Sequence, residues 1–144
     1  MQIGVETARA VENKRIFVVD DDEIIRAALQ FMLHDENETH EIASLDLAFA
    51  KAAEWKPDLI LLAASLVRAN GVEILSQIRE RIAGVKILVV VDSATDEIAR
   101  QCLAARANGV LAKPLRIEAV REKVDVLLGR RAGFAIPLTV LKTP

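Results

Sequence analysis

A run of acidic residues is the first feature of the sequence that could carry chemistry. Asp20, Asp21 and Asp22 directly follow an apolar stretch and precede a helical pattern. Neighbouring carboxylates repel one another unless a cation or the positive end of a helix dipole offsets their charge. Helix capping explains one or two of these acids, whereas carboxylate oxygens also suit Mg²⁺. These residues alone support the two interpretations about equally.

A lysine in the second half of the chain, Lys113, also follows an apolar stretch and precedes Pro114. An ammonium group at such a place can neutralise a phosphoryl oxygen as a point charge. Taken alone, Lys113 is more simply a solvated surface lysine. Its meaning therefore depends on whether the fold brings it to the same edge as the acids.

The elements that must position these side chains alternate between two periods. Apolar runs typical of strands lie at 15–20, 41–43, 59–63, 86–91 and 110–112. Between and after them, apolar residues recur at helical spacing. The predicted inner faces of the five helices are Ile25, Ala28, Leu29, Met32 and Leu33; Leu45, Ala48, Phe49, Ala52 and Ala53; Val72, Leu75, Ile78 and Ile82; Ile98, Ala99, Cys102 and Leu103; and Ile117, Val120, Val124, Leu127 and Leu128.

This order predicts an α/β fold of the (βα)5 type, with a doubly wound, five-stranded parallel sheet, because parallel neighbours need a crossover helix. Residues 35–39 and the segment that leads to the Asn70-Gly71 turn pair are predicted to be loops. Ligands of such sheets bind outside the carboxyl ends of the strands. The acidic run and Lys113 are both expected at that edge.

Composition and charge narrow the function classes. The chain has 144 residues, 52% of them hydrophobic, which suits one folded domain and excludes disorder. A net charge of -2 and an aromatic content of 3% do not favour nucleic-acid binding. The single cysteine excludes an internal disulfide and a Cys-based zinc site. The sequence shows neither a signal-peptide pattern nor an apolar stretch of membrane length, so we expect a cytoplasmic protein without membrane contact.

In combination, these motifs resemble the response-regulator receiver domain of two-component signalling, which has the same five-stranded, flavodoxin-like sheet. The resemblance covers residues 14–128, nearly all of the predicted globular part. The motifs that carry it are IFVVDDDE at 16–23, PDLILL at 57–62, Asn70-Gly71 and GVLAKPL at 109–115.

The resemblance implies roles for individual side chains. Asp20 and Asp21 match the acidic pair that holds Mg²⁺, and Asp22 completes the acidic pocket. Lys113 matches the lysine that contacts the phosphoryl group. The bond between Lys113 and Pro114 would be cis in this family, and proline is nearly the only residue that tolerates a cis bond.

Three other positions depart from the family pattern. Ala63 stands where the family has its phosphoacceptor aspartate, and alanine supplies neither a nucleophile nor a metal-binding oxygen. Val91 replaces the Thr or Ser that hydrogen-bonds the phosphoryl group, and Val110 replaces the aromatic switch residue. The three losses together imply a natural pseudo-receiver. Its Mg²⁺ binding through Asp20 and Asp21 would be weak at best, and no other cofactor is implied.

Nearby residues do not replace the missing acceptor. Ser65 lies two residues beyond the required position, Asp58 stands at the opposite end of the strand, and Asp92 is more simply a cap of the following helix. We therefore expect a phosphorylation-independent, non-enzymatic signalling module of a two-component phosphorelay that acts by protein–protein contact. The implied partners are a histidine kinase, a phosphotransfer or effector protein and a second copy of the chain, with no direct DNA binding.

The predicted surface and termini complete this picture. Receiver-like proteins commonly bind partners through the last two helices and the strand between them, and here that surface has the mixed charge of an ordinary solvated face. Its predicted outward residues are Arg100, Arg106, Arg116, Arg121, Glu118 and Glu122. Residues 1–13 are assigned to an N-terminal extension, 14–128 to the receiver-like domain and 129–144 to a tail. The apolar segment FAIPLTVL at 134–141 is expected to dock on the domain or on a second subunit.

An enzyme remains as the alternative. The pattern Asp20-x-Asp22 after an apolar strand also resembles the nucleophile and acid pair of Mg²⁺-dependent, haloacid-dehalogenase-type phosphatases, with Ser93 and Lys113 as phosphate binders. The sequence lacks a later acidic pair to complete that metal site and an insertion to enclose a substrate.

Overall fold

The computed structural model describes residues 13–130. The proposed tail segment 134–141 and most of the N-terminal extension lie outside the described residues. Within them, each strand is followed by at least one helix, as predicted. The elements in chain order are β1 (Arg15–Val19), α2 (Glu23–Leu33), β2 (Glu38–Ile42), α3 (Leu45–Ala52), β3 (Leu59–Ala63), α4 (Ala64–Asn70), α5 (Glu73–Arg81), β4 (Lys86–Val91), α6 (Glu97–Ala104), β5 (Gly109–Ala112) and α7 (Ile117–Leu127).

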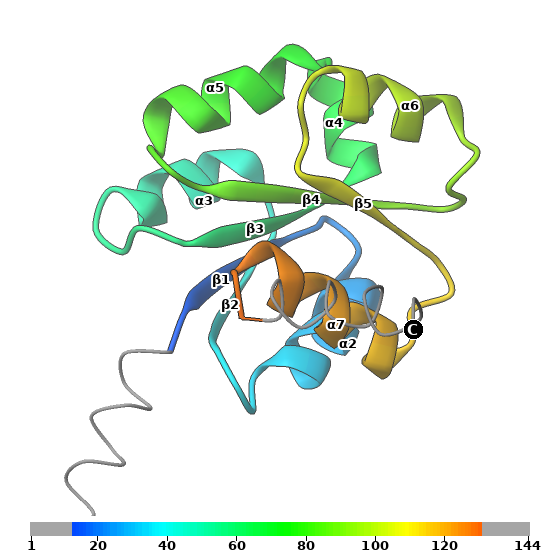
Figure 1. Cartoon of the computed structure of the whole chain (residues 1–144). Helices are drawn as coiled ribbons and strands as arrows, with labels where there is room; N and C mark the ends of the chain where they lie inside the picture. Colours follow the sequence, from blue (N-terminus) through cyan, green and yellow to red (C-terminus); the bar gives the residue numbers. More distant parts are fainter. Residues whose placement is uncertain (1–12, 131–144) are drawn as a thin grey trace, which may run out of the picture.

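The five strands form one parallel sheet in the order β2-β1-β3-β4-β5. Helices α2 and α7 cover one face and α3, α4, α5 and α6 cover the other (Figure 1). This arrangement confirms the predicted doubly wound sheet. The chain moves outward from β1 to β2 and then returns to β3, so the strand order reverses between β1 and β3. Ligand sites of open α/β sheets lie at such a reversal, outside the carboxyl ends of the strands.

The sheet is buried on both faces, which explains why its central strands are apolar throughout. Ile16 and Val18 of β1 pack with α2 and α7, and Phe17 and Val19 pack with the helices of the opposite face. All four of these side chains are fully buried. Because successive strand residues point to opposite faces, one short segment contributes to both halves of the core.

The second strand begins earlier than its sequence pattern predicts. β2 spans Glu38–Ile42, so two residues of the predicted 35–39 loop belong to the sheet, and Ala43 does not. Among the strands of residues 13–130, β2 pairs only with β1, and the register places Glu38 opposite Arg15. The Arg15 Nε to Glu38 Oε2 distance is 2.6 Å, so an ion pair holds a polar residue in an edge strand. Apolar periodicity cannot reveal a strand of this kind.

A helix that the sequence pattern did not predict follows β3 without a loop. α4 occupies Ala64–Asn70, where a loop was expected. Val67 anchors it in the core with a fully buried side chain, and the Asn70 Nδ2 group donates to the Leu66 carbonyl oxygen at 2.8 Å. Gly71 ends the helix at a φ of 86°, a left-handed conformation that glycine adopts without strain.

Two predicted inner-face residues lie at the surface instead. Leu103 is 48% exposed, because the core face of α6 is formed by Ile98, Ala99 and Cys102, and Leu103 projects past its edge. Ala53 is exposed because α3 ends at the preceding residue. None of the helices within residues 13–130 is long and apolar enough to cross a membrane.

Candidate functional site

Asp20 occupies the carboxyl end of β1, beside the reversal of strand order. Its side chain is largely buried, with 5% exposure. Asp20 Oδ1 accepts the backbone N–H of Asp22 at 2.8 Å, and the Asp20 carbonyl oxygen accepts from Arg26 Nη1 at 2.8 Å. The carboxylate is therefore fixed at the strand end and not free to turn into solvent.

The other two acids of the run have different partners. Asp22 is the N-cap of α2, and its Oδ1 accepts the backbone N–H groups of Ile24 at 2.9 Å and Ile25 at 3.3 Å. Asp21 is exposed, and its Oδ1 accepts the hydroxyl of Ser65 at 3.1 Å. For Asp22 the structure shows helix capping, one of the two interpretations that the sequence left open. Asp20 and Asp21 remain available to a cation.

Burial raises the pKa of Asp20 above its ordinary value, because desolvation disfavours the charged carboxylate. The hydrogen bond from the Asp22 backbone opposes this effect, and the negative charges of Asp21 and Asp22 add to it. Lys113 lowers the pKa by the smallest of these contributions. Desolvation and the acidic neighbours thus outweigh the hydrogen bond and Lys113 in their effect on the pKa of Asp20.

Lys113 lies at the same edge of the sheet as the acids. Its backbone N–H donates to the Val91 carbonyl oxygen at 3.0 Å, and the Lys113–Pro114 peptide bond is cis. Its ammonium group pairs with Asp92, with 3.2 Å between Nζ and Oδ1. The expectation that Asp92 caps a helix is wrong, because the N-cap of α6 is Asp96. Asp92 instead lies between β4 and the helix, where it binds the lysine.

The three positions that depart from the family pattern carry apolar side chains at or near this edge. β1 and β3 pair with Val19 opposite Leu62, so Asp20 has Ala63 as its neighbour on β3. Ala63 is 6% exposed, and Val91 at the end of β4 is fully buried. Val110 of β5 is half-buried and packs against the core. None of these three side chains can donate or accept a hydrogen bond.

The oxygen donors at this edge fit Mg²⁺ only in part. Asp20 and Asp21 each keep a carboxylate oxygen that no hydrogen bond within residues 13–130 uses, whereas Ala63 contributes no oxygen. Mg²⁺ prefers six oxygen ligands and accepts one or two carboxylates when water supplies the rest. Within the described part of the chain, no group of three or more His, Cys, Asp or Glu side chains is placed to hold a metal ion.

The geometry does not favour the phosphatase alternative. In that mechanism Asp22 would protonate a leaving group, yet its carboxylate caps α2. Ser93, a candidate phosphate binder, has its hydroxyl 2.9 Å from that of Thr95 and donates its backbone N–H to Asp96. Lys113 is paired with Asp92. The residues proposed for the reaction are thus engaged with their own elements.

The predicted mixed-charge surface is correct except at one residue. Arg121 is half-buried and not outward, because its Nε donates to the Met32 carbonyl oxygen at 2.9 Å and its Nη2 lies 3.2 Å from Asp35 Oδ2. It joins α7 to the end of α2. Arg100 is exposed and forms an ion pair with Glu97 one turn earlier on α6.

The sequence interpretation underestimated Ser65 and missed Arg26. Ser65 reaches Asp21 only because α4 starts directly at the end of β3 and turns its first residues towards β1. The absence of glycine and proline from residues 64–70 was the available signal for that helix. Arg26 lies in the first turn of α2 and donates to the Asp20 carbonyl oxygen. The apolar pattern used to predict the inner face of the helix does not include this residue.

Comparison with known proteins gives a consistent result. Residues 16–125 match the family model described as the response regulator receiver domain. The chain is 33% identical over 135 residues to the alkaline phosphatase synthesis transcriptional regulatory protein PhoP of Bacillus subtilis, covering 90% of this chain and 54% of that protein. It is 28% identical over 116 residues to the chemotaxis protein CheY of Halobacterium salinarum, covering 80% and 97%. The chain thus spans about half of the first relative and nearly all of the second.

A solved structure agrees on the fold. A response regulator from Thermotoga maritima superposes with a TM-score of 0.74 at 20% identity, covering 81% of this chain and 98% of that one. At this identity the likeness concerns the fold alone. Neither this likeness nor the family match supports a phosphatase of the haloacid-dehalogenase type.

Proposed function

This chain belongs to the response regulator receiver family, and we propose that it is a pseudo-receiver that signals through protein contacts without being phosphorylated at the end of β3. The family assigns it to two-component signalling, in which receiver domains interact with histidine kinases and effectors. The proposal adds that this chain transmits its signal by binding alone and has no enzymatic activity of its own.

The observation that carries the proposal is Ala63. Register with β1 makes it the neighbour of Asp20, at the strand end where the family has its acceptor carboxylate. A methyl group has no lone pair with which to attack a phosphoryl donor. The hydroxyl of Ser65 is the nearest alternative nucleophile in the sequence, but Ser65 lies on α4, two residues beyond the strand-end position of the acceptor.

The switch positions support the same conclusion. A phosphoryl group at this edge would need a hydrogen-bond donor at the end of β4, and Val91 is apolar and fully buried. Val110 packs against the core beside β4, where a reorienting aromatic ring would sit. Lys113 is held by Asp92. The residues that would sense a phosphoryl group are therefore absent or otherwise bound.

Mg²⁺ binding is expected to survive only weakly. Asp20 and Asp21 would hold the ion with water completing its coordination, and the ion would offset the negative charge of the pocket. Removal of the third carboxylate at position 63 takes away both a ligand and a unit of attraction.

Incubation with Mg²⁺ and acetyl phosphate, followed by intact-mass spectrometry, tests the proposal. We expect no phosphoryl adduct on the natural chain and no stable complex with beryllofluoride. Ala63→Asp is the matched variant, because it restores a carboxylate beside Asp20 and should gain an acid-stable, hydroxylamine-sensitive adduct. A phosphoryl adduct on the natural chain, at Ser65 or elsewhere, would contradict the proposal.

A further inference from the structure

Strand β2 forms an open edge of the sheet. Its inner side is used by β1, since the Glu38 N–H donates to the Lys14 carbonyl oxygen at 2.8 Å and the Ile42 carbonyl oxygen accepts from the Asp20 N–H at 3.1 Å. Backbone groups of a strand alternate in direction, so the N–H and C=O groups of Thr39 and Glu41 point away from β1. Among residues 13–130, no strand pairs with that outer side.

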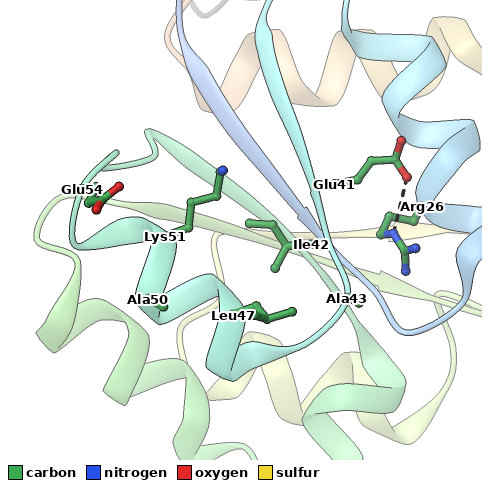
Figure 2. A pocket seen from close by; sticks show the side chains of 8 residues that line it. All are labelled: Arg26, Glu41, Ile42, Ala43, Leu47, Ala50, Lys51 and Glu54. Atoms are coloured by element: carbon green, nitrogen blue, oxygen red, sulfur yellow. Dashed lines mark ion pairs between the residues drawn. The ribbon is translucent and has the colours of Figure 1, made fainter.

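A cavity of about 540 Å³ lies against this edge. Figure 2 shows that Ile42 projects from β2 towards α3, while Glu41 projects to the opposite side and pairs with Arg26. The α3 side of the cavity combines apolar and charged side chains, and Leu47 is 57% exposed there. The residues that line the cavity are Arg26, Glu41, Ile42, Ala43, Leu47, Ala50, Lys51 and Glu54.

The described chain ends beside the start of the same strand. Arg130 Nη2 donates to Asn37 Oδ1 at 2.8 Å, and its guanidinium pairs with Asp125 at 2.9 Å. Asn37 is 6% exposed, immediately precedes β2 and donates its side-chain N–H to the Leu33 carbonyl oxygen. The last described residue, Arg130, is therefore bound through its side chain at the amino end of the open edge.

We propose that residues 134–141 of the same chain add to the outer side of β2 as a sixth, parallel strand whose apolar side chains fill the cavity beside α3. The three residues between Arg130 and this segment, 131–133, can span about 10 Å when extended. The eight residues FAIPLTVL then span about 26 Å, whereas the five residues of β2 span about 17 Å.

In this segment, the position of the proline and the position of the apolar side chains favour the same orientation of the strand. Phe134, Ile136, Leu138 and Val140 alternate with Ala135, Pro137, Thr139 and Leu141. Proline has no N–H to donate, so the backbone of Pro137 must point away from β2. The backbone groups of the even-numbered residues then point towards β2 and form the hydrogen bonds with that strand. In a parallel ladder, those residues lie opposite Glu38, His40 and Ile42, whose side chains face α3. Phe134, Ile136 and Leu138 consequently lie on the side of the sheet where Ile42 lines the cavity.

Backbone amide exchange of the full chain, measured by NMR, tests this placement at Thr39 and Glu41. We expect both amides to exchange at least about tenfold more slowly in the natural chain than in Leu138→Asp, because a carboxylate loses hydration when it packs against Ile42 and Leu47. Ala135→Asp is the matched control, since residue 135 belongs to the opposite face and its variant should retain the protection.

Sedimentation of the same samples distinguishes the chain's own segment from that of a second copy. Protection in a monomer, lost in Leu138→Asp and kept in Ala135→Asp, supports the proposal. Three outcomes overturn it: equal exchange in all three proteins, equal loss of protection in both variants, and protection that appears only in a dimer. Amides of β3, which lies inside the sheet, report whether either variant has lost its fold.

Discussion

At the scale of single residues, the most informative side chain is Asp20. It is buried and flanked by two further acids, its carboxylate accepts the N–H of Asp22, and the ammonium group of Lys113 is paired with Asp92. Its pKa is raised chiefly by desolvation. An acid whose pKa is higher in the folded state binds its proton more tightly there, so ionisation of Asp20 destabilises the fold.

The first residue-scale prediction follows from that sign. Asp20→Asn should raise the free energy of unfolding at pH 7 by on the order of 1 kcal/mol, because an amide oxygen keeps the bond to Asp22 without the charge. The gain should shrink as pH falls from the raised pKa of the folded state to the ordinary pKa of an aspartate, below which Asp20 is protonated in both states. Urea unfolding of both proteins at several pH values measures the difference.

Asp21→Asn provides the control for this prediction. Its side chain is exposed, so removal of its charge should change the unfolding free energy by less than about 0.5 kcal/mol. Equal stability of the natural chain and Asp20→Asn at pH 7 would show that the buried carboxylate carries no energetic cost.

At the scale of elements, the start of α2 determines which acid is structural. Asp22 satisfies two backbone N–H groups that the first turn of the helix leaves unpaired, and Glu23 adds negative charge near the positive end of the dipole. Helix α2 in turn supplies Leu29 and Leu33 to the core under β1 and β2. A cap on this helix therefore stabilises the scaffold behind the acidic pocket.

We predict that Asp22→Ala lowers the free energy of unfolding by about 1 kcal/mol, whereas Asp22→Asn retains nearly all of it, because asparagine is an equally good N-cap. Thermal or chemical unfolding at neutral pH measures both. A loss of equal size in the two variants would instead indicate that the negative charge of Asp22, and not its cap, stabilises the protein.

At the scale of the whole molecule, the sheet brings together residues that lie far apart in the sequence. Asp20, Ser65 and Lys113 come from three different segments and meet at one edge because parallel strands present all their carboxyl ends together. The same topology leaves β2 at the edge with a cavity beside it. The molecule thus has an acidic edge with Ala63 at the end of β3, and a second surface near its described C-terminal end.

Mg²⁺ provides a test at this scale, because an ion that binds only the folded state stabilises the whole chain. We predict that 10 mM MgCl₂ raises the unfolding midpoint of the natural chain by less than about 1 °C relative to NaCl of equal ionic strength, and that of Ala63→Asp by several degrees. Differential scanning calorimetry measures both shifts. A shift in the natural chain as large as in the variant would contradict the weak-site proposal.

The alternation of strands and helices could be predicted from the sequence alone, and so could the positions of the acids and Lys113 directly after their strands. Burial on two faces makes a central strand apolar throughout, and this pattern is visible in residues 59–63 and 86–91 without any structure. The replacement at Ala63 is equally a property of the sequence, because a missing functional group requires no coordinates to recognise.

Which of these groups contact one another is visible in the folded structure and not in the sequence. Nothing local indicates that Lys113 pairs with Asp92, that Ser65 reaches Asp21 or that Arg130 is held by Asn37, because each contact joins different elements. The edge strand β2 and helix α4 were mispredicted for a related reason. The conformation of β2 depends on the ion pair between Arg15 and Glu38, and that of α4 on the buried side chain of Val67. These interactions are made with residues that are distant in the sequence, so they produce no periodic pattern in it.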